Sequence, residues 1–256
     1  MYRTLEIGRA FKMSRPLLAA FDFDHTIYDD NSDIVARKLY PNDSLPDSVE
    51  RLYARDNWTL YMGKIFELLN ENSIDVETIE SAINRIPSVP GIDTLLTELH
   101  SRDCEIIIIS DSNSLFIEWW LNHKGLSHTV KEIFTNPATV DEESGMLKIE
   151  MYHLQDYCKL SNKNLCKGQI LEDYISRRFA EGVNFEKIAY VGDGKNDYCP
   201  ILRLSEKDVA FPRVGYTLVK VLNQTDDETR QVKADVVPWE SGEEIFEDLK
   251  KRISSL

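Results

Sequence analysis

The sequence has few cysteines, and they follow no recognisable pattern. The four in this 256-residue chain are irregularly spaced without a CxxC pair: Cys104, Cys158, Cys166 and Cys199. This spacing signals neither a disulfide framework nor a zinc ribbon. Cys158 and Cys166 together with His153 also fit no standard zinc-ligand spacing, so we expect ordinary buried or surface thiols. Sparse cysteines favour a reducing, cytoplasmic setting.

Long apolar segments are missing as well. Runs such as Ile106–Ile109 are far shorter than the roughly 20 residues of a membrane-spanning helix. The N-terminus also lacks the apolar stretch of a secretory signal. We therefore expect no membrane partner. Residues 1–13 are predicted to form a tail, and their basic side chains leave mitochondrial targeting open as an alternative.

Positive charge is scarce too. The chain has 30 Lys and Arg residues against 44 Asp and Glu residues, which gives a net charge of −14. Such a chain repels polyphosphate backbones, so the composition argues against a nucleic-acid partner. A small anionic substrate remains compatible, provided that the site itself supplies positive charge.

What the sequence does have is a regular alternation of buried strands and helices. Helical patterns cover Ser114–His123, Cys166–Phe179 and Glu243–Ile253. Short apolar runs that end in polar clusters predict the strands Leu17–Phe23, Glu105–Ile109, Lys187–Val191, Asp208–Phe211 and Asp235–Val237. This alternation predicts an α/β fold built on a parallel sheet.

One interval breaks the alternation. Between the first and second strands lie three helical patterns and no strand-like run: Asp47–Asp56, Thr59–Asn70 and Val76–Asn84. We therefore expect an all-helical subdomain at 36–89, inserted into a core made of 14–35 and 90–256. Thr135–Lys148 is predicted to form an extended hairpin or loop that turns near Gly145.

The first strand ends in two acids. Asp22 and Asp24 are two residues apart, so their side chains point to the same side of the strand, and Thr26 follows at the same spacing. Two carboxylates this close need a cation or a shared proton. An EF-hand loop is excluded, because Ile27 stands where that loop needs Gly and a strand precedes the motif.

Other strands also end in polar residues. Ser110 closes the second strand, and Asp193, Asn196 and Asp197 follow the third, while Lys167 begins a predicted helix. Because parallel strands share their carboxyl edge, we expect these groups to converge. Several carboxylates with a single lysine need a hard divalent cation, and oxygen ligands favour Mg²⁺. Mg²⁺ and a lysine beside an exposed carboxylate suit phosphoryl transfer.

The order of these motifs resembles the haloacid dehalogenase superfamily of aspartyl-phosphate phosphatases. The longer strings FDFDHTIYDDNSD, IIIISDSNS, NLCK and VGDGKNDYCP are similar to the branch that contains phosphoethanolamine/phosphocholine phosphatase and pyridoxal-phosphate phosphatase. The likeness covers roughly residues 16 to 240. It implies a Rossmannoid parallel sheet, with the helical insertion acting as a mobile cap over the substrate.

The resemblance also implies roles for the acids. Asp22 would be the nucleophile, and Asp24 would first protonate the leaving oxygen and then activate water. Thr26 would hold Asp24 in place. Mg²⁺ would be held by Asp22, by the backbone carbonyl of Asp24 and by Asp193.

The remaining site residues would bind the phosphoryl group or support those that do. Ser110 and Lys167 would bind the phosphoryl oxygens, with Lys167 also neutralising the nucleophile. Asn196 and Asp197 would act indirectly, Asp197 through water or by orienting Lys167.

The leaving group is suggested by two further acids, Asp33 and Asp111. In the resembled branch the matching positions are proposed to contact an amine, and a carboxylate near a phosphate site attracts an ammonium group. The alternative is that these acids cap helices. Stacking on Trp58, Tyr61 or Phe66 would instead favour pyridoxal phosphate, although aromatics at helical spacing are more often core. The sequence does not decide between these substrates.

Two other functions stay open. The chain could hydrolyse another small metabolite, such as phosphoserine, a nucleotide or pyrophosphate, or it could be a catalytically silent binding module on the same fold. The expected partner is a small phosphorylated metabolite, and the sequence indicates no oligomeric state.

Overall fold

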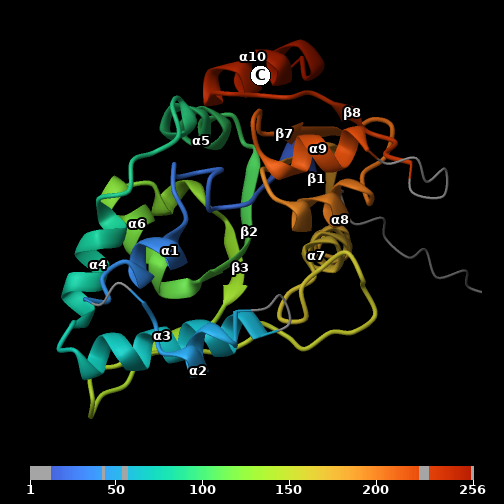
Figure 1. Cartoon of the computed structure of the whole chain (residues 1–256). Coiled ribbons are helices and arrows are strands. Elements are labelled where there is room, and N and C mark those ends of the chain that lie inside the picture. The colour runs from blue at the N-terminus through green and yellow to red at the C-terminus, as the bar shows by residue number, and fades with distance from the viewer. Residues whose placement is uncertain (1–12, 42–43, 54–56, 225–230, 255–256) are drawn as a thin grey trace, which may run out of the picture.

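The computed structural model describes residues 13–41, 44–53, 57–224 and 231–254. Its centre is a parallel sheet of six strands in the order β3-β2-β1-β6-β7-β8 (Figure 1). The strands are β1 (Met13–Phe21), β2 (Glu105–Asn113), β3 (Glu132–Asn136), β6 (Val183–Gly192), β7 (Val209–Pro212) and β8 (Asp235–Val236). The predicted α/β parallel-sheet fold is confirmed. The predicted tail lies outside the described residues except for Met13, which begins β1.

The central strand shows why the sheet is buried on both faces. Leu17, Ala19 and Phe21 of β1 belong to one hydrophobic cluster, whereas Leu18 and Ala20 belong to a second cluster. Successive side chains of a strand point to opposite faces, so a continuous apolar run supplies both cores.

Helices cover each face of the sheet (Figure 1). The first cluster includes apolar residues of α5 (Ile92–Ser101), α6 (Ser114–Lys124) and α10 (Gly242–Arg252). The second includes residues of α7 (Lys167–Ala180), α8 (Tyr198–Ile201) and α9 (Thr217–Asn223). Two short 3₁₀ helices complete the core elements, η2 (Ser127–Thr129) and η3 (Lys195–Asp197).

The predicted helical interval contains helices and no strand among its described residues. These are α1 (Ser32–Arg37), which begins before it, α2 (Asp47–Glu50), α3 (Trp58–Glu71) and α4 (Val76–Asn84). The helix predicted at Asp47–Asp56 is shorter than expected, and residues 54–56 lie outside the described part. The apolar faces of α3 and α4 share one hydrophobic cluster with α5 and α6. The division into a core and an inserted cap therefore stays a prediction.

The extended segment after β3 forms a hairpin, as predicted. β4 (Ala138–Val140) pairs antiparallel with β5 (Leu147–Ile149), and β5 packs against α3. β3 itself was not predicted from the sequence. It lies at the sheet edge, where Glu132 and Ile133 are only half-buried, so it lacks the apolar run that marks the inner strands. None of the described helices is long and apolar enough to cross a membrane.

Candidate active site

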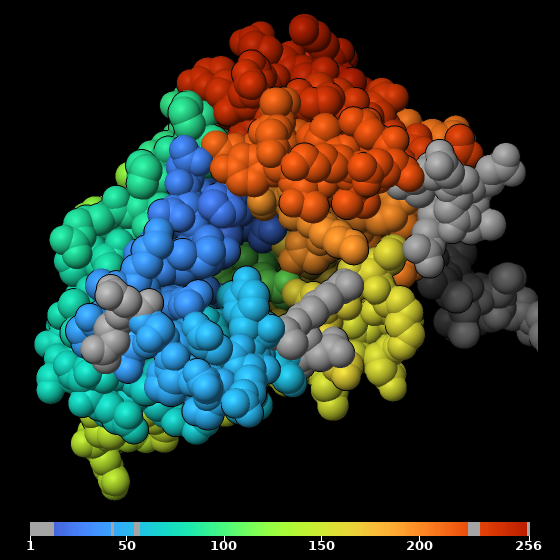
Figure 2. All heavy atoms as spheres, viewed as in Figure 1, coloured from blue at the N-terminus to red at the C-terminus, as the bar shows by residue number. Residues whose placement is uncertain are grey.

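A polar pocket lies at the carboxyl ends of β1, β2 and β6. It has a volume of about 220 Å³, and the surface is hollowed between the blue and orange segments (Figure 2). Its walls combine residues that follow β1, the end of β2 and the turn after β6 with Trp58 of α3 and Asn162. The predicted residues that line it are Asp22, Asp24, Asp33, Ser110, Asp111, Asp193 and Asn196. Parallel strands point the same way, so their ends deliver these side chains to one place.

Lys167 joins two of the carboxylates beneath this pocket. Its Nζ lies 2.5 Å from Oδ2 of Asp22 and 2.7 Å from Oδ1 of Asp197. The side chain is 1% exposed. Burial works against its charge, but the Asp197 and Asp22 carboxylates outweigh this effect and raise the pKa of Lys167. The lysine therefore stays cationic beside Asp22.

Asp197 is fixed by the turn that follows β6. Its Oδ1 also accepts a hydrogen bond from the Tyr190 hydroxyl at 2.7 Å, and its Oδ2 accepts the backbone N–H groups of Asp193 and Gly194. A Cβ on Gly192 would lie 2.5 Å from Cγ of Asp197, so this approach requires a glycine. The prediction was that Asp197 acts indirectly, through water or by orienting Lys167. The direct contact with Lys167 agrees with the second of these alternatives, and the role itself stays a prediction.

The acids around Lys167 form a set that suits a cation. Single carboxylate oxygens of Asp22, Asp193 and Asp197 lie within 4.8 Å of one another. Burial and the charge of Asp197 raise the pKa of Asp22, and the same two causes raise the pKa of Asp193 to about 8. One lysine leaves this cluster short of positive charge. Asp22 and Asp193 line the pocket, whereas Asp197 is fully buried and does not line it, so the carboxylates that face the pocket and could hold a hard divalent ion are Asp22 and Asp193.

Asp24 is held in a way that the sequence did not predict. Its Oδ1 accepts hydrogen bonds from the Tyr28 hydroxyl at 2.5 Å and from the Ser32 hydroxyl at 2.9 Å. The prediction that Thr26 holds Asp24 is wrong, because the Thr26 hydroxyl lies 3.5 Å from Oδ1 of Asp193 instead. Burial raises the pKa of Asp24, which favours its protonated form.

The end of β2 presents two serines. Ser110 lines the pocket, and its Oγ accepts a hydrogen bond from the backbone N–H of Ser112 at 3.2 Å. The Ser112 hydroxyl in turn lies 2.8 Å from the Ser32 hydroxyl. Ser32 and Ser112 thus link Asp24 to the end of β2. No periodic pattern in the sequence indicated either serine.

Asp111 is surrounded by asparagine amides. Its carboxylate accepts hydrogen bonds from Nδ2 of Asn162 at 2.7 Å, of Asn164 at 3.3 Å and of Asn196 at 2.6 Å. Burial raises the pKa of Asp111. Only Asn196 was predicted, because Asn162 and Asn164 come from an irregular segment whose position no periodicity reveals.

Asp33 lies in the first turn of α1, where it meets α3. Its Oδ2 accepts a hydrogen bond from the Trp58 indole at 2.7 Å. Its Oδ1 is buried and has no hydrogen-bond partner among the described residues. Burial and the nearby Asp24 carboxylate raise the pKa of Asp33. An unpartnered buried carboxylate oxygen is a place for an added cation or proton.

The other two aromatics considered from the sequence do not reach this pocket. Tyr61 and Phe66 are 2% and 1% exposed, respectively, and both belong to the hydrophobic core. The Phe66 ring packs against Phe116 at 5.8 Å. Of the three, Trp58 alone lines the pocket, so stacking of a substrate on Tyr61 or Phe66 is excluded.

Comparison with known proteins identifies relatives over most of the chain. Residues 17–253 match the family described as Putative Phosphatase. The chain is 38% identical to pyridoxal phosphate phosphatase PHOSPHO2 of Mus musculus over 238 residues, covering 91% of this chain and 97% of that protein. It is 34% identical to phosphoethanolamine/phosphocholine phosphatase of Homo sapiens over 252 residues, covering 97% and 94% of the two chains.

Solved structures agree on the fold. A substrate-bound phosphoserine phosphatase is similar to this chain with a TM-score of 0.60 and 20% identity, covering 93% of this chain and 99% of that one. At this identity the likeness establishes the fold alone. The family match and the relatives go further, and the chain therefore belongs to this phosphatase family, in the branch of PHOSPHO2 and phosphoethanolamine/phosphocholine phosphatase.

Proposed function

We propose that this chain is a Mg²⁺-dependent phosphomonoester hydrolase that acts on a small amine-bearing phosphate through an aspartyl phosphate on Asp22. The observation that carries the proposal is the 2.5 Å contact between Asp22 Oδ2 and Lys167 Nζ at the floor of an acidic pocket. A carboxylate held beside a buried cation is oriented and ready to attack an electrophile. The relatives named for pyridoxal phosphate and for phosphoethanolamine or phosphocholine support this choice of substrate class.

The metal would be held by Asp22, Asp193 and the backbone carbonyl of Asp24. When bound, Mg²⁺ neutralises negative charge that gathers on the phosphoryl oxygens. Lys167 adds a second positive charge, and Ser110 supplies a hydroxyl donor at the end of β2. Without these groups, the surrounding carboxylates would repel a phosphate.

The covalent chemistry belongs to two acids. A carboxylate oxygen of Asp22 forms a bond to phosphorus while the ester P–O bond breaks, and Asp24 gives its proton to the leaving oxygen. Asp24 then takes a proton from water as that water attacks phosphorus, which releases Asp22 and inorganic phosphate. The hydrogen bonds from Tyr28 and Ser32 hold Asp24 in position, and its raised pKa supports the initial protonated state.

Asp33 and Asp111 would bind the ammonium group, which lies at the end of the substrate opposite the phosphate. None of the described residues that line the pocket is Lys or Arg, while Asp33 keeps a buried oxygen without a partner. Such a wall disfavours polyanions such as pyrophosphate and favours a zwitterion with an ammonium group. The Trp58 face offers a quaternary ammonium or a pyridine ring a further contact. Residues 36–89, through Trp58, would close over the substrate as a cap.

We expect dialysis against EDTA to lower phosphate release from p-nitrophenyl phosphate at least about 100-fold, because a catalytic metal contributes several kcal/mol. Added Mg²⁺ restores the activity. In Asp193→Asn, which loses one proposed ligand, the Mg²⁺ concentration for half-maximal activity rises. Full activity after complete metal removal would contradict the metal requirement, and absence of any phosphate release with Mg²⁺ present would point to a silent binding module.

Substrate choice is tested by Asp33→Asn. We expect kcat/KM for phosphoethanolamine to fall about 10- to 100-fold, the worth of one charge-assisted contact, with little change for glycerol phosphate. Asp111→Asn should act in the same direction. The control is Asp30→Asn, because Asp30 Oδ1 accepts the Asn31 N–H and an asparagine preserves that acceptor. Equal losses on both substrates would count against recognition of the amine.

The raised pKa of Asp33 gives the same contact a pH dependence. Asp33 is protonated at low pH, becomes charged as the pH passes its raised pKa, and attracts an ammonium group only then. The ratio of kcat/KM for phosphoethanolamine to that for glycerol phosphate should therefore increase with pH above the ordinary carboxyl range. Asp33→Asn should flatten the pH dependence of this ratio. Both substrates carry a phosphate group, so its titration largely cancels when the ratio is taken. A ratio that stays flat in the wild type would refute the assignment.

A further inference from the structure

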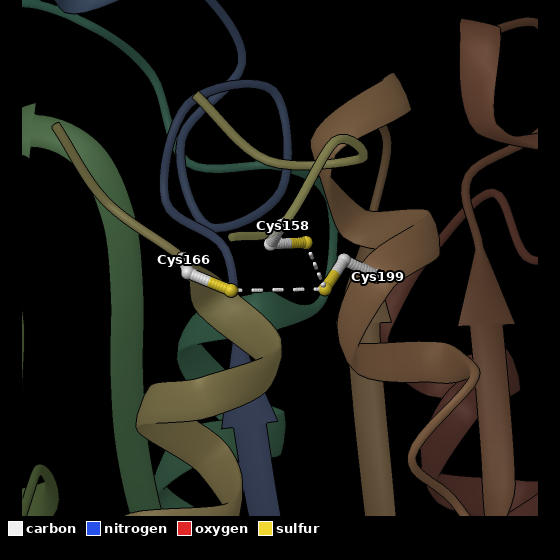
Figure 3. Close-up of side chains that lie close together, drawn as sticks. All are labelled: Cys158, Cys166 and Cys199. Carbon is white, nitrogen blue, oxygen red and sulfur yellow. Dashed lines mark hydrogen bonds between the residues drawn. The ribbon is translucent and has the colours of Figure 1, made fainter. Parts of the chain in front are cut away.

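Three cysteines, Cys158, Cys166 and Cys199, lie close together (Figure 3). Cys158 comes from the irregular segment that precedes α7, Cys166 is the N-cap of α7, and Cys199 lies in α8. The Cys199 Sγ is 3.5 Å from the Cys158 Sγ and 3.9 Å from the Cys166 Sγ. All three sulfur atoms lie within 4.8 Å of one another. Cys199 is 33 residues beyond Cys166, which explains why the sequence spacing gave no signal.

The sulfur separations match a metal thiolate. With zinc–sulfur bonds of about 2.3 Å, the sulfurs of a tetrahedral site are about 3.8 Å apart. The distances from the Cys199 Sγ to the other two sulfurs, 3.5 and 3.9 Å, fall on either side of that value. A disulfide needs about 2.05 Å, so these cysteines are unbonded thiols in this structure. Packing alone does not require three sulfurs from separate segments to converge.

The surroundings favour a thiolate at this place. The N-terminal end of the 14-residue helix α7 is at Cys166, and a helix N-terminus stabilises negative charge. The hydrogen bond with Cys199 lowers the pKa of Cys166, while the same contact and burial raise the pKa of Cys199, so Cys166 is the thiol that most readily loses its proton. His153 is already engaged, since its Nε2 accepts the Cys166 backbone N–H at 2.9 Å. Cys158 is partly exposed, so an ion has a way in.

A fourth position lies next to Ser161. Its hydroxyl is 3.4 Å from the Cys158 Sγ and 3.3 Å from the Cys166 Sγ. We propose that Cys158, Cys166 and Cys199 bind one thiophilic divalent cation of the zinc class, with water or the Ser161 hydroxyl completing the site. Thiolates select such ions, whereas Mg²⁺ requires oxygen ligands, so this site does not compete with the carboxylates.

The cysteine site lies next to Lys167 and Asp197 in the sequence, so a cation bound there would help to position this pair. Cys166 directly precedes Lys167, and Cys199 follows Asp197 by two residues. A Cβ on Gly168 would lie 2.6 Å from the Cys199 sulfur, so α7 and α8 already approach closely here. A bound cation would fasten the irregular segment to both helices. It would act as a positioning element for the Lys167–Asp197 pair.

The test uses cobalt as a spectroscopic substitute for zinc. Reduced, metal-free full-length protein is titrated with Co²⁺, and we expect one equivalent to produce the intense sulfur-to-cobalt charge-transfer absorption. Cys158→Ser should weaken or abolish this absorption, whereas Cys104→Ser, which changes a buried cysteine outside the cluster, should leave it intact. The absence of the absorption in the wild type, or an unchanged absorption in Cys158→Ser, would overturn the proposal.

A second variant adds a ligand instead of removing one. Ser161→Cys places a fourth thiolate beside two of the sulfurs, so we expect the apparent Kd for Zn²⁺ to fall at least about tenfold. An unchanged Kd would count against a site at this position. A Cys158–Cys199 disulfide that survives excess thiol reductant and excludes cobalt would also overturn the proposal. The cobalt absorption should persist in Asp22→Asn. The test of the cysteine site therefore does not depend on phosphatase activity.

Discussion

Asp22→Asn is expected to lower kcat/KM for phosphate release at least about 10³-fold, which corresponds to about 4 kcal/mol. The amide keeps the size of the side chain but cannot act as the nucleophile that forms an aspartyl phosphate. The buried negative charge is lost as well, and this charge is crowded by Asp193 and Asp197. The folded protein should therefore tolerate the change well, and its melting temperature without divalent metal should not fall.

The matched control for this variant is Asp30→Asn, which changes the same residue type in the same loop and lies outside the pocket lining. It should retain activity within a few fold. Comparable phosphate release by Asp22→Asn and the wild type would remove Asp22 from the mechanism. Normal melting of the inactive variant would show that chemistry, and not folding, was lost.

Lys167→Met is expected to reduce both stability and activity. It leaves Asp22 and Asp197 buried without their cation, and breaking a buried ion pair in this way costs about 3–5 kcal/mol. For a chain of this size, that corresponds to a fall of roughly 10 °C in the melting temperature in the absence of divalent metal. Adding Asp197→Asn should recover part of the loss, because it removes one of the two unpaired charges.

Lys220→Met is the control, because it removes the same charge from a lysine that is exposed on α9. This variant should have the melting temperature of the wild type. Activity of Lys167→Met should remain low even at temperatures where it is fully folded, since the phosphoryl group and Asp22 have lost a positive charge. If Lys167→Met melts like Lys220→Met, the lysine is not a paired cation in the folded protein. If its folded form keeps full activity, Lys167 plays no part in the reaction.

The sequence predicts best where local chemistry and burial agree. Inner strands such as Leu17–Phe21 are apolar on both faces, so length and flanking acids suffice to place them. The acids of DFDHT and GDGKND follow such strands directly, and the shared edge of a parallel sheet then brings them together. The structure confirms this convergence for Asp22, Asp24 and Asp193.

Prediction from the sequence fails where a side chain's hydrogen-bond partner is distant in the sequence. It also fails where a segment has no hydrophobic periodicity. Thr26 was expected beside Asp24, but the turn instead brings Tyr28 and Ser32 to that carboxylate. Asn162 and Asn164 reach Asp111 from a segment without regular structure, across more than fifty residues. These contacts depend on tertiary folding, and no pattern within a short window encodes them.

The hydrogen bond between Trp58 and Asp33 has a practical consequence. Trp58 is a half-buried indole at the pocket wall, whereas Trp120 and Trp239 are buried in the core and bond to backbone carbonyls. Any molecule that displaces water near Asp33 changes the polarity around Trp58 while leaving those two core indoles undisturbed. The intrinsic fluorescence of the protein should therefore report occupancy of the pocket in real time, without an added dye and without turnover.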